Sequence, residues 1–243
     1  MRQLIATFNA MAARLAANEQ QRRRFLADIT HELRNPLAVL ESELEAQFDG
    51  IHPRDDHHIA SLLEETRRLS RLIDDLHTLA LAETGRLELR QDAVAFGDLI
   101  EDIVERHQAL AGQRDVALDI ALAPTMPKAW VDPARVQQVV DNLLANAIRH
   151  SPTGGQVTVQ VATTRAGPDD RQMVQCRVTD AGPGFRDDQL DRVFERFTRA
   201  ADSGGSGLGL SIARDLIQAH GGTIDAGNDP TTGGATITFT LPT

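Results

Sequence analysis

The chain has 243 residues, of which 41% are hydrophobic and 25% are charged, and its formal net charge is -10. This composition is too apolar for a wholly disordered chain, and the length suffices for one large domain or two modest ones. The acidic balance argues against nucleic acid as a bulk electrostatic partner, so we expect no nucleic acid.

The apolar segments and the cysteine content limit the environments that suit the chain. We find no apolar run of about 18 residues and no signal peptide in residues 1–17, so we expect a cytoplasmic chain. Any membrane contact would be made by a segment upstream of Met1. The single cysteine, Cys176, excludes a disulfide within the chain, and its place in an alternating apolar run predicts a core thiol in a strand.

The N-terminal third predicts two long helices. Apolar residues recur at helical spacing over residues 4–44, and those over residues 59–80 alternate in steps of three and four, which forms a seam for another helix. The stretch 49–56 should separate the helices, and Gly85 should end the second one. One hairpin cannot bury both seams, whereas two hairpins form a four-helix bundle, so we expect a homodimer.

From about residue 87 the pattern changes to short strands and helices, and it lacks the regular alternation of a doubly wound sheet. We therefore expect an α/β sandwich with one mixed sheet. The expected strands are LELRQ, VALDIAL, QVTVQVA, MVQCRVTD and ATITFTL, the expected helices span 97–110, 133–149, 187–196 and 208–219, and GGTIDAGN and TTGG are expected turns.

A polar cluster lies in the first helix, in the segment FLADITHELRNPLAVL. At 100° per residue His31 points away from the apolar face, and Asn35 lies one turn further along on the same side. A neutral imidazole is a good nucleophile at neutral pH, and the adjacent carboxylate of Glu32 can hold its other N–H. Asn35 could orient a water, and Pro36 should loosen or bend the helix. Taken alone, however, an exposed helical histidine is usually only a surface residue.

The segment DNLLANAIRHSP, residues 141–152, carries a second group of polar side chains. Asn142 and Asn146 share one face of a helix, and their amide oxygens could meet Mg²⁺ that also holds phosphate oxygens. Arg149 and His150 could reach those phosphates. The simpler alternative is a helix with two surface asparagines.

The segment DAGPGF, residues 180–185, follows an expected strand directly. The Asp180 carboxylate could accept the exocyclic amine of adenine, and Gly182 and Gly184 allow close approach of the backbone. An ordinary strand-to-loop turn explains this segment equally well when it is taken alone.

A glycine-rich segment, GGSGLGLSIARDLI, opens the last expected helix. Gly205, Gly207 and Gly209 would present backbone N–H groups and the helix dipole to an anion, which is a natural phosphate site. The segment is not a Walker A sequence, and Lys128, the single lysine, lies far from it, so a P-loop mechanism is excluded.

Taken together and in this order, HELRNP, NLLANAIRHSP, DAGPGF, FERF and GGSGLGLSIA resemble the bacterial sensor histidine kinases over about residues 20–241. Residues 1–20 look like the last helix of a HAMP signal relay. The resemblance implies a dimerisation and phosphotransfer domain over 21–86, a helical hairpin that forms a dimeric four-helix bundle. It also implies a catalytic domain over 87–243, an α/β sandwich of the Bergerat ATP-binding type.

The resemblance also implies a function, with ATP and Mg²⁺ as cofactors. His31 would take the γ-phosphate of ATP and pass it to an aspartate of a response regulator, and the parent protein would be anchored in the bacterial inner membrane. Glu32 would be the acid/base partner of His31, and Asn35 would serve dephosphorylation of the regulator. The implied nucleotide site comprises Asn142 and Asn146 (also the metal ligands), Arg149, His150, Asp180, Gly182, Gly184, Phe194, Phe197, Arg199, Gly205, Ser206, Gly207, Leu208, Gly209 and Leu210.

Two departures from the family pattern concern the nucleotide site. His150 stands where the family commonly has an aromatic residue such as Tyr, and only residues 198–204 separate Phe197 from Gly205, where a longer lid is expected. Two other functions remain open: an ATPase of the same fold that drives a clamp, and a dimer that binds nucleotide and only scaffolds a partner. The acceptor motif HELRNP argues against the clamp, and the intact His31/Glu32 and Asn142/Asn146 pairs argue against the scaffold.

Overall fold

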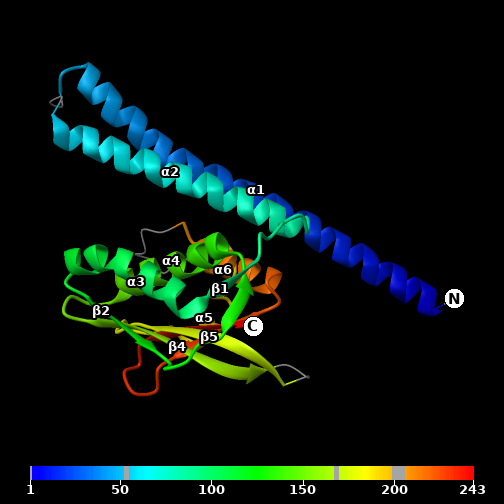
Figure 1. The fold of residues 1–243 in the computed structure, drawn as a ribbon. Helices are drawn as coiled ribbons and strands as arrows, with labels where there is room; N and C mark the ends of the chain where they lie inside the picture. The colour runs from blue at the N-terminus through cyan, green and yellow to red at the C-terminus, as the bar shows by residue number, and fades with distance from the viewer. Residues whose placement is uncertain (1, 52–54, 167–169, 199–205) are drawn as a thin grey trace. The chain divides into compact units, whose positions relative to one another are not determined.

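The structure is a computed structural model that describes residues 2–51, 55–166, 170–198 and 206–243 (Figure 1). It divides the chain into two compact units, Met1–Leu76 and His77–Thr243. Among the helices of the described residues, none combines the length and the apolar character needed to cross a bilayer.

Two long helices form the N-terminal region. Helix α1 (Arg2–Phe48) and helix α2 (Asp56–Glu83) run antiparallel as a hairpin, as expected (Figure 1). Both helices end in the same way, because Gly50 and Gly85 have positive φ values of 73° and 63°. Each glycine is followed by a residue whose N–H donates to a carbonyl five residues back, over 2.9 Å. This pattern is typical of a glycine C-cap, so the expected break and stop are confirmed.

Helix α1 continues through Pro36, where we expected a weak point. Pro36 lies inside the helix and is buried, and the helix runs twelve residues further to Phe48. Proline removes one backbone hydrogen bond but does not end a helix whose remaining bonds are intact. Pro36 therefore does not interrupt the helix that carries His31.

The second unit is built around one mixed five-stranded sheet. The strand order is β2-β4-β5-β7-β6, in which β2 and β4 are parallel and all other neighbours are antiparallel. The strands are β2 (Ala117–Leu122), β4 (Gln156–Ala166), β5 (Arg171–Thr179), β6 (Thr223–Asn228) and β7 (Ala235–Pro242).

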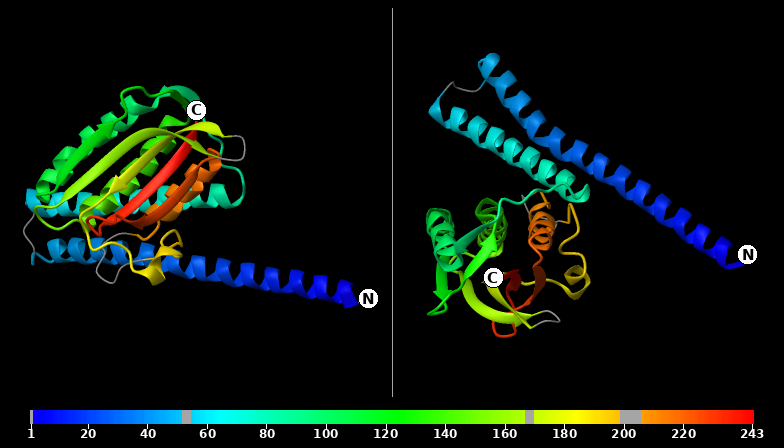
Figure 2. Two further views of the ribbon diagram at one scale, coloured as in Figure 1. Left: turned by 90° about the horizontal axis from the view of Figure 1, so that it is seen from below. Right: turned by 45° about the vertical axis from the view of Figure 1, so that its right-hand side comes forward.

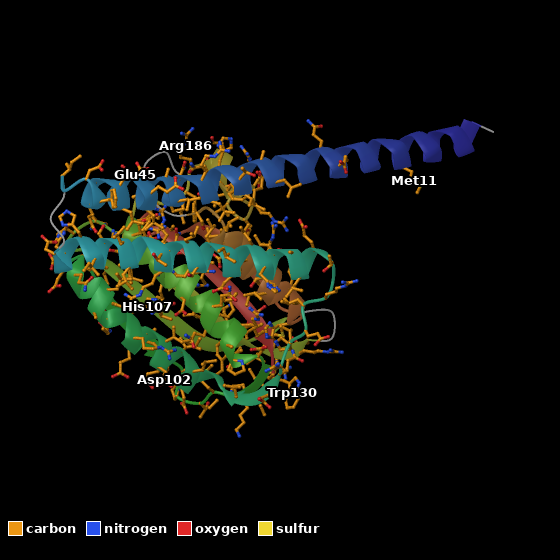
Figure 3. All side chains as sticks on the ribbon, turned by 90° about the horizontal axis from the view of Figure 1, so that it is seen from above. Met11, Glu45, Asp102, His107, Trp130 and Arg186 are labelled. Atoms are coloured by element: carbon orange, nitrogen blue, oxygen red, sulfur yellow. The ribbon has the colours of Figure 1, made fainter. Side chains whose placement is uncertain are left out.

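Three helices cover one face of this sheet, which makes the expected α/β sandwich (Figures 1 and 2). They are α3 (Phe96–Gln113), α4 (Pro133–His150) and α6 (Gly209–Ala219), and α4 packs against both of the others. A short antiparallel pair, β1 (Asp92–Ala95) and β3 (Lys128–Val131), accompanies them, and its Trp130 is exposed (Figure 3).

The core lies between the helices and the sheet. Phe96 of α3 meets Phe239 of β7 edge to face, with ring centroids 6.4 Å apart, and both side chains are fully buried. Cys176 is buried on β5, and burial raises the pKa of its thiol to about 12. The expectation of a core thiol is therefore confirmed.

A buried polar network fixes the start of α4, the helix that carries the asparagine pair. The Asp132 carboxylate accepts from the N–H groups of Ala134 and Arg135 at 3.1 Å, as an N-cap does, and from the Arg90 N–H at 2.9 Å. The Asp132 N–H in turn donates to Nε2 of His220, just beyond α6, at 3.0 Å. Because Nε2 accepts this bond, Nδ1 is the donor to the Leu216 carbonyl, 2.8 Å away.

Three expected elements differ from those observed. LELRQ (87–91) is not a strand, because the Arg90 N–H bonds to a carboxylate and not to a neighbouring strand. GGTIDAGN is not a turn, since Thr223–Asn228 pairs with β7 as an edge strand. The helix expected over 187–196 is only α5 (Asp187–Leu190), after which the backbone continues in short turns.

Candidate functional site

Helix α4 supports the predicted metal and phosphate residues. Its apolar face is buried, and Asn142, Asn146, Arg149 and His150 are half-buried along the rest of the helix. The Asn142 amide nitrogen donates to the Gly209 carbonyl at 3.2 Å. Asn142 thus ties α4 to the first residue of α6, and its amide oxygen can still face a ligand.

Asp180 lies at the end of β5 and is 6% exposed. Its Oδ1 accepts two backbone N–H bonds of 2.9 Å, one from Gly182 and one from Ala235 at the start of β7. Both bonds end on Oδ1, so Oδ2 can accept from a ligand N–H. A carboxylate held in this way presents one fixed acceptor at the end of the strand.

Close backbone contacts surround Asp180 and require glycine. A Cβ on Gly234 would lie 1.8 Å from the Asp180 carbonyl oxygen, and one on Gly182 would lie 2.8 Å from the His150 carbonyl oxygen. Gly184 has a φ of 72°, and a Cβ there would lie 2.3 Å from the Gly233 carbonyl oxygen. These distances are far below van der Waals contact, so the loop is built for glycine at these three positions.

The Asp180 loop also packs against the end of α4. The Ala181 N–H donates to Oγ of Ser151, the residue that follows α4, at 3.4 Å, and Gly182 lies against the His150 carbonyl. Two predicted motifs, NLLANAIRHSP and DAGPGF, thereby meet at one place. Asn146 and His150 are one helical turn apart, so the predicted metal residue lies close to this junction.

His150 and Asp180 influence each other's ionisation. Partial burial, followed by the nearby Arg149 charge, lowers the pKa of His150, and the Asp180 charge opposes this shift. Burial raises the pKa of Asp180, against the lowering effects of the Gly182 and Ala235 N–H groups and of His150. The two side chains therefore belong to one electrostatic environment.

The segment before α6 is closed by a backbone hydrogen bond. The Phe197 N–H donates to the Gly207 carbonyl at 2.9 Å, and a Cβ on Gly207 would lie 2.9 Å from the Phe197 backbone. Both residues have positive φ, 58° for Phe197 and 70° for Gly207. Phe194, Phe197, Ser206, Gly207, Gly209 and Leu210 are half-buried and Leu208 is fully buried, whereas Arg199 and Gly205 lie outside the described residues.

The predicted phosphoacceptor residues lie together on α1, in the other unit. His31 and Asn35 are exposed and Glu32 is half-buried, while Leu33 on the apolar face is also half-buried. An exposed imidazole one turn from an exposed carboxamide can be reached by another protein domain. The helical angle of about 100° per residue predicts this outward orientation of His31 without further information.

Several residues that shape the site were not predicted. Asn228 clamps Phe185 through two bonds, accepting from its N–H at 2.7 Å and donating to its carbonyl at 2.8 Å. Arg196 forms ion pairs with Glu83 and Asp215. Only the position of Arg196 inside FERF could have drawn attention to it, and no sequence signal marked Asn228, because it lay in a segment predicted to be a turn.

Comparisons with known proteins agree with this arrangement. Residues 21–85 match the His Kinase A (phospho-acceptor) domain family, and residues 131–243 match the family of histidine kinase-, DNA gyrase B- and HSP90-like ATPases. The chain is 39% identical to the signal transduction histidine-protein kinase BaeS of Escherichia coli and 33% identical to the sensor histidine kinase WalK of Bacillus subtilis. These matches cover 98% and 92% of this chain but only 50% and 37% of the relatives.

A solved structure gives the same result for the fold. The Acinetobacter baumannii histidine kinase AdeS matches with a TM-score of 0.72 at 27% sequence identity, over 87% of this chain and 97% of that chain. The order of the two domains, the mixed sheet and the motifs around α4 all agree with one family. The chain belongs to the sensor histidine kinases of bacterial two-component systems.

Proposed function

We propose that this chain is the kinase core of a sensor protein and transfers the γ-phosphate of ATP to His31. A neutral imidazole nitrogen of His31 forms the N–P bond, the bond from the γ-phosphorus to the β,γ-bridging oxygen breaks, and its electron pair leaves with ADP. Glu32 accepts a hydrogen bond from the other ring N–H and stabilises the charge that develops on the imidazole.

One observation carries this proposal: α4 contacts both loops that the nucleotide needs. Its end meets the Asp180 loop through Ser151, and Asn142 meets the first residue of α6. Asp180 Oδ2 would accept the adenine amine, the N-terminus of α6 and Arg149 would provide positive potential for the phosphates, and the His150 ring would donate a hydrogen bond to them. Phe194 and Phe197 would flank the segment that covers the nucleotide, together with Arg199 and Gly205.

We also propose that Asn146, helped by Asn142, holds Mg²⁺ at the phosphates. Among the described residues no cluster of three or more His, Cys, Asp or Glu could hold a metal without help. A cation bound by an amide oxygen and phosphate oxygens fits this donor set, because Mg²⁺ is usually held by few protein ligands together with substrate phosphates. Bound Mg²⁺ would neutralise phosphate charge. ATP affinity that is equal with Mg²⁺ and with a chelator would refute this assignment.

Replacement of His31 by Gln tests the phosphoacceptor. Incubation with γ-labelled ATP and Mg²⁺ should label the native chain with an acid-labile, base-stable phosphate, and His31→Gln should abolish that label because no nucleophile remains. His57→Gln, which changes another exposed histidine of the hairpin, should label normally. His31→Gln should still bind ATP, since His31 lies in the other unit. Label that survives at native levels would move the site elsewhere.

We further propose that phospho-His31 passes its phosphate to an aspartate of a response regulator and that Asn35 serves the reverse, phosphatase direction. Asn35 is exposed one turn beyond His31, so a docked regulator would meet both. Its amide could align a water against the acyl phosphate of the regulator. It has no evident role in the attack on ATP, which requires only the imidazole and its carboxylate partner.

Asn35→Ala should therefore separate the two activities. Autophosphorylation should stay within a few-fold of native, while dephosphorylation of the regulator should slow by about 100-fold, the scale of a lost positioning group. The helical content and dimer state of the variant serve as the control because Pro36 is adjacent. If a folded variant loses both activities together, the proposed division of roles is wrong.

The remaining assignments follow from the family. We propose that residues 1–20 end a HAMP-like relay, that residues 21–86 dimerise, and that residues 87–243 form the catalytic domain, located in the cytoplasm. The E. coli relative is about twice as long as this chain, and we propose that a further segment of the parent protein anchors it in the inner membrane. Cell fractionation of the parent protein tests this location.

A further inference from the structure

Arg196 joins three separate parts of the second unit. It lies in the segment between α5 and α6, and its Nη1 bonds to Oε1 of Glu83, the last residue of α2. Its Nη2 lies 3.6 Å from Oδ2 of Asp215 on α6. The side chains of Arg196 and Asp215 are only 20% and 17% exposed, so water screens this pair less than a surface pair, whereas Glu83 is 48% exposed.

The neighbour of Arg196 needs such a restraint. Phe197 has a φ of 58°, a conformation that residues with a side chain rarely adopt, and its N–H holds the Gly207 carbonyl. Strained backbone persists only where the surrounding structure over-determines it. The Phe197–Gly207 bond restrains one side of this residue, and the Arg196 ion pairs restrain the other.

The guanidinium group suits this task. It is planar, permanently charged and offers several N–H donors in a rigid fork, so one arginine can bridge two carboxylates that lie on different elements. A nearby pair in the same segment shows the contrast. Arg192 and Glu195 also bond, at 2.8 Å, but their side chains are 66% and 51% exposed and they connect no other element.

We propose that Arg196 is a positioning residue for the kinase reaction, which fixes the segment 191–198, between α5 and α6, to the end of α2 and to α6. This inference rests on the proposed function, because the segment matters only if ATP binds beside it. Arg196 does not contact the reacting atoms. It sets the orientation of Phe197 and of the glycine-rich start of α6, the groups proposed to enclose the phosphates.

The ion pair with Glu83 also gives the site a link to the helical hairpin. Glu83 is the last residue of α2, the helix that follows α1. A shift at the end of α2 would therefore move Arg196 and the backbone next to Phe197. The nucleotide site would then respond to the state of α2 through one charged side chain, with no change in the residues that touch ATP.

A double-mutant cycle tests this role in the full chain. The variants are Arg196→Gln, Glu83→Gln, the combination of both, and the control Arg192→Gln. For each, kcat and KM for ATP in autophosphorylation would be measured, together with thermal unfolding of the nucleotide-free protein. We expect Arg196→Gln to lower kcat/KM about tenfold, since small misplacements of positioning groups reduce rates strongly. Arg192→Gln should stay within about twofold, because exposed pairs contribute little.

The cycle distinguishes positioning from general stabilisation. If the pair acts as a unit, the double variant should be no worse than Arg196→Gln alone, and Arg196→Lys should recover only part of the loss. Native kinetics for Arg196→Gln, or losses from Glu83→Gln and Arg196→Gln that simply multiply, would overturn the inference. A loss that only follows the fraction of unfolded protein would also overturn it. A native chain that binds no ATP would overturn the proposed function and this inference with it.

Discussion

His150 and Asp180 place two titrating groups of opposite response in the proposed nucleotide site. Folding lowers the pKa of His150 below its ordinary value of 6.5, so the unfolded chain takes up this proton first as the pH falls. The contribution of His150 to the free energy of unfolding is therefore fully present above pH 6.5 and is lost as the pH falls below it. Folding raises the pKa of Asp180 above 3.8, so as the pH falls the folded chain binds a proton at Asp180 before the unfolded chain does. The free energy of unfolding therefore rises as the pH falls through the pKa that Asp180 has in the folded chain.

Replacing His150 by Gln should therefore flatten the upper part of the pH profile. Between about pH 7.5 and about pH 5.5 the thermal midpoint of the native protein should fall more than that of His150→Gln, which has no proton to gain at this position. Calorimetry across this range measures the difference. His77→Gln, a change at an exposed histidine of the same unit, provides the control and should keep the native slope. Equal slopes for His150→Gln and the native protein would show that His150 does not drive this dependence.

At the scale of single elements, helices with clear periodicity were predictable and edge strands were not. Helices α3, α4 and α6 follow apolar patterns that local sequence reveals, and their observed bounds lie close to the expected ones. Strand β6 contains three polar residues and a glycine, and it forms only because β7 supplies a partner along its whole length. Propensity cannot predict a strand whose stability comes from a distant neighbour.

The same distinction holds for the elements of the site. The residues on one helix, Asn142 and Asn146 or His31 and Asn35, were predicted because helical spacing places them on one face. The contacts that join elements were not predictable, because they connect residues far apart in the chain. Asn228 holds Phe185 across 43 positions, and Arg196 reaches Glu83 across 113. Such pairs arise from the tertiary fold and carry no local signal.

For the whole molecule, the hairpin leaves apolar surface that a single chain does not cover. Among the side chains that the structure describes, thirteen large apolar ones are exposed, of which ten lie in Met1–Leu76 and three in the second unit. Ile59 and Ile73 of the predicted α2 seam are 49% and 52% exposed, and Leu44 on α1 is 53% exposed. Exposed apolar surface on this scale marks a protein interface. Two hairpins in a four-helix bundle would cover it, as the seam predicted.

The full chain should therefore be a dimer whose strength depends on this seam. Ile73→Glu should weaken dimerisation by about 100-fold or more, because each subunit loses a buried isoleucine worth about 1.5–3 kcal/mol and gains a charge at the interface. Sedimentation velocity over a range of concentrations measures the shift. Trp130→Gln provides the matched control: Trp130 is 55% exposed on β3, outside the hairpin, and its loss should leave the dimer unchanged. A native chain that stays monomeric at micromolar concentration, or an Ile73→Glu variant that dimerises as before, would exclude the bundle, since no other arrangement proposed for the hairpin covers the α2 seam.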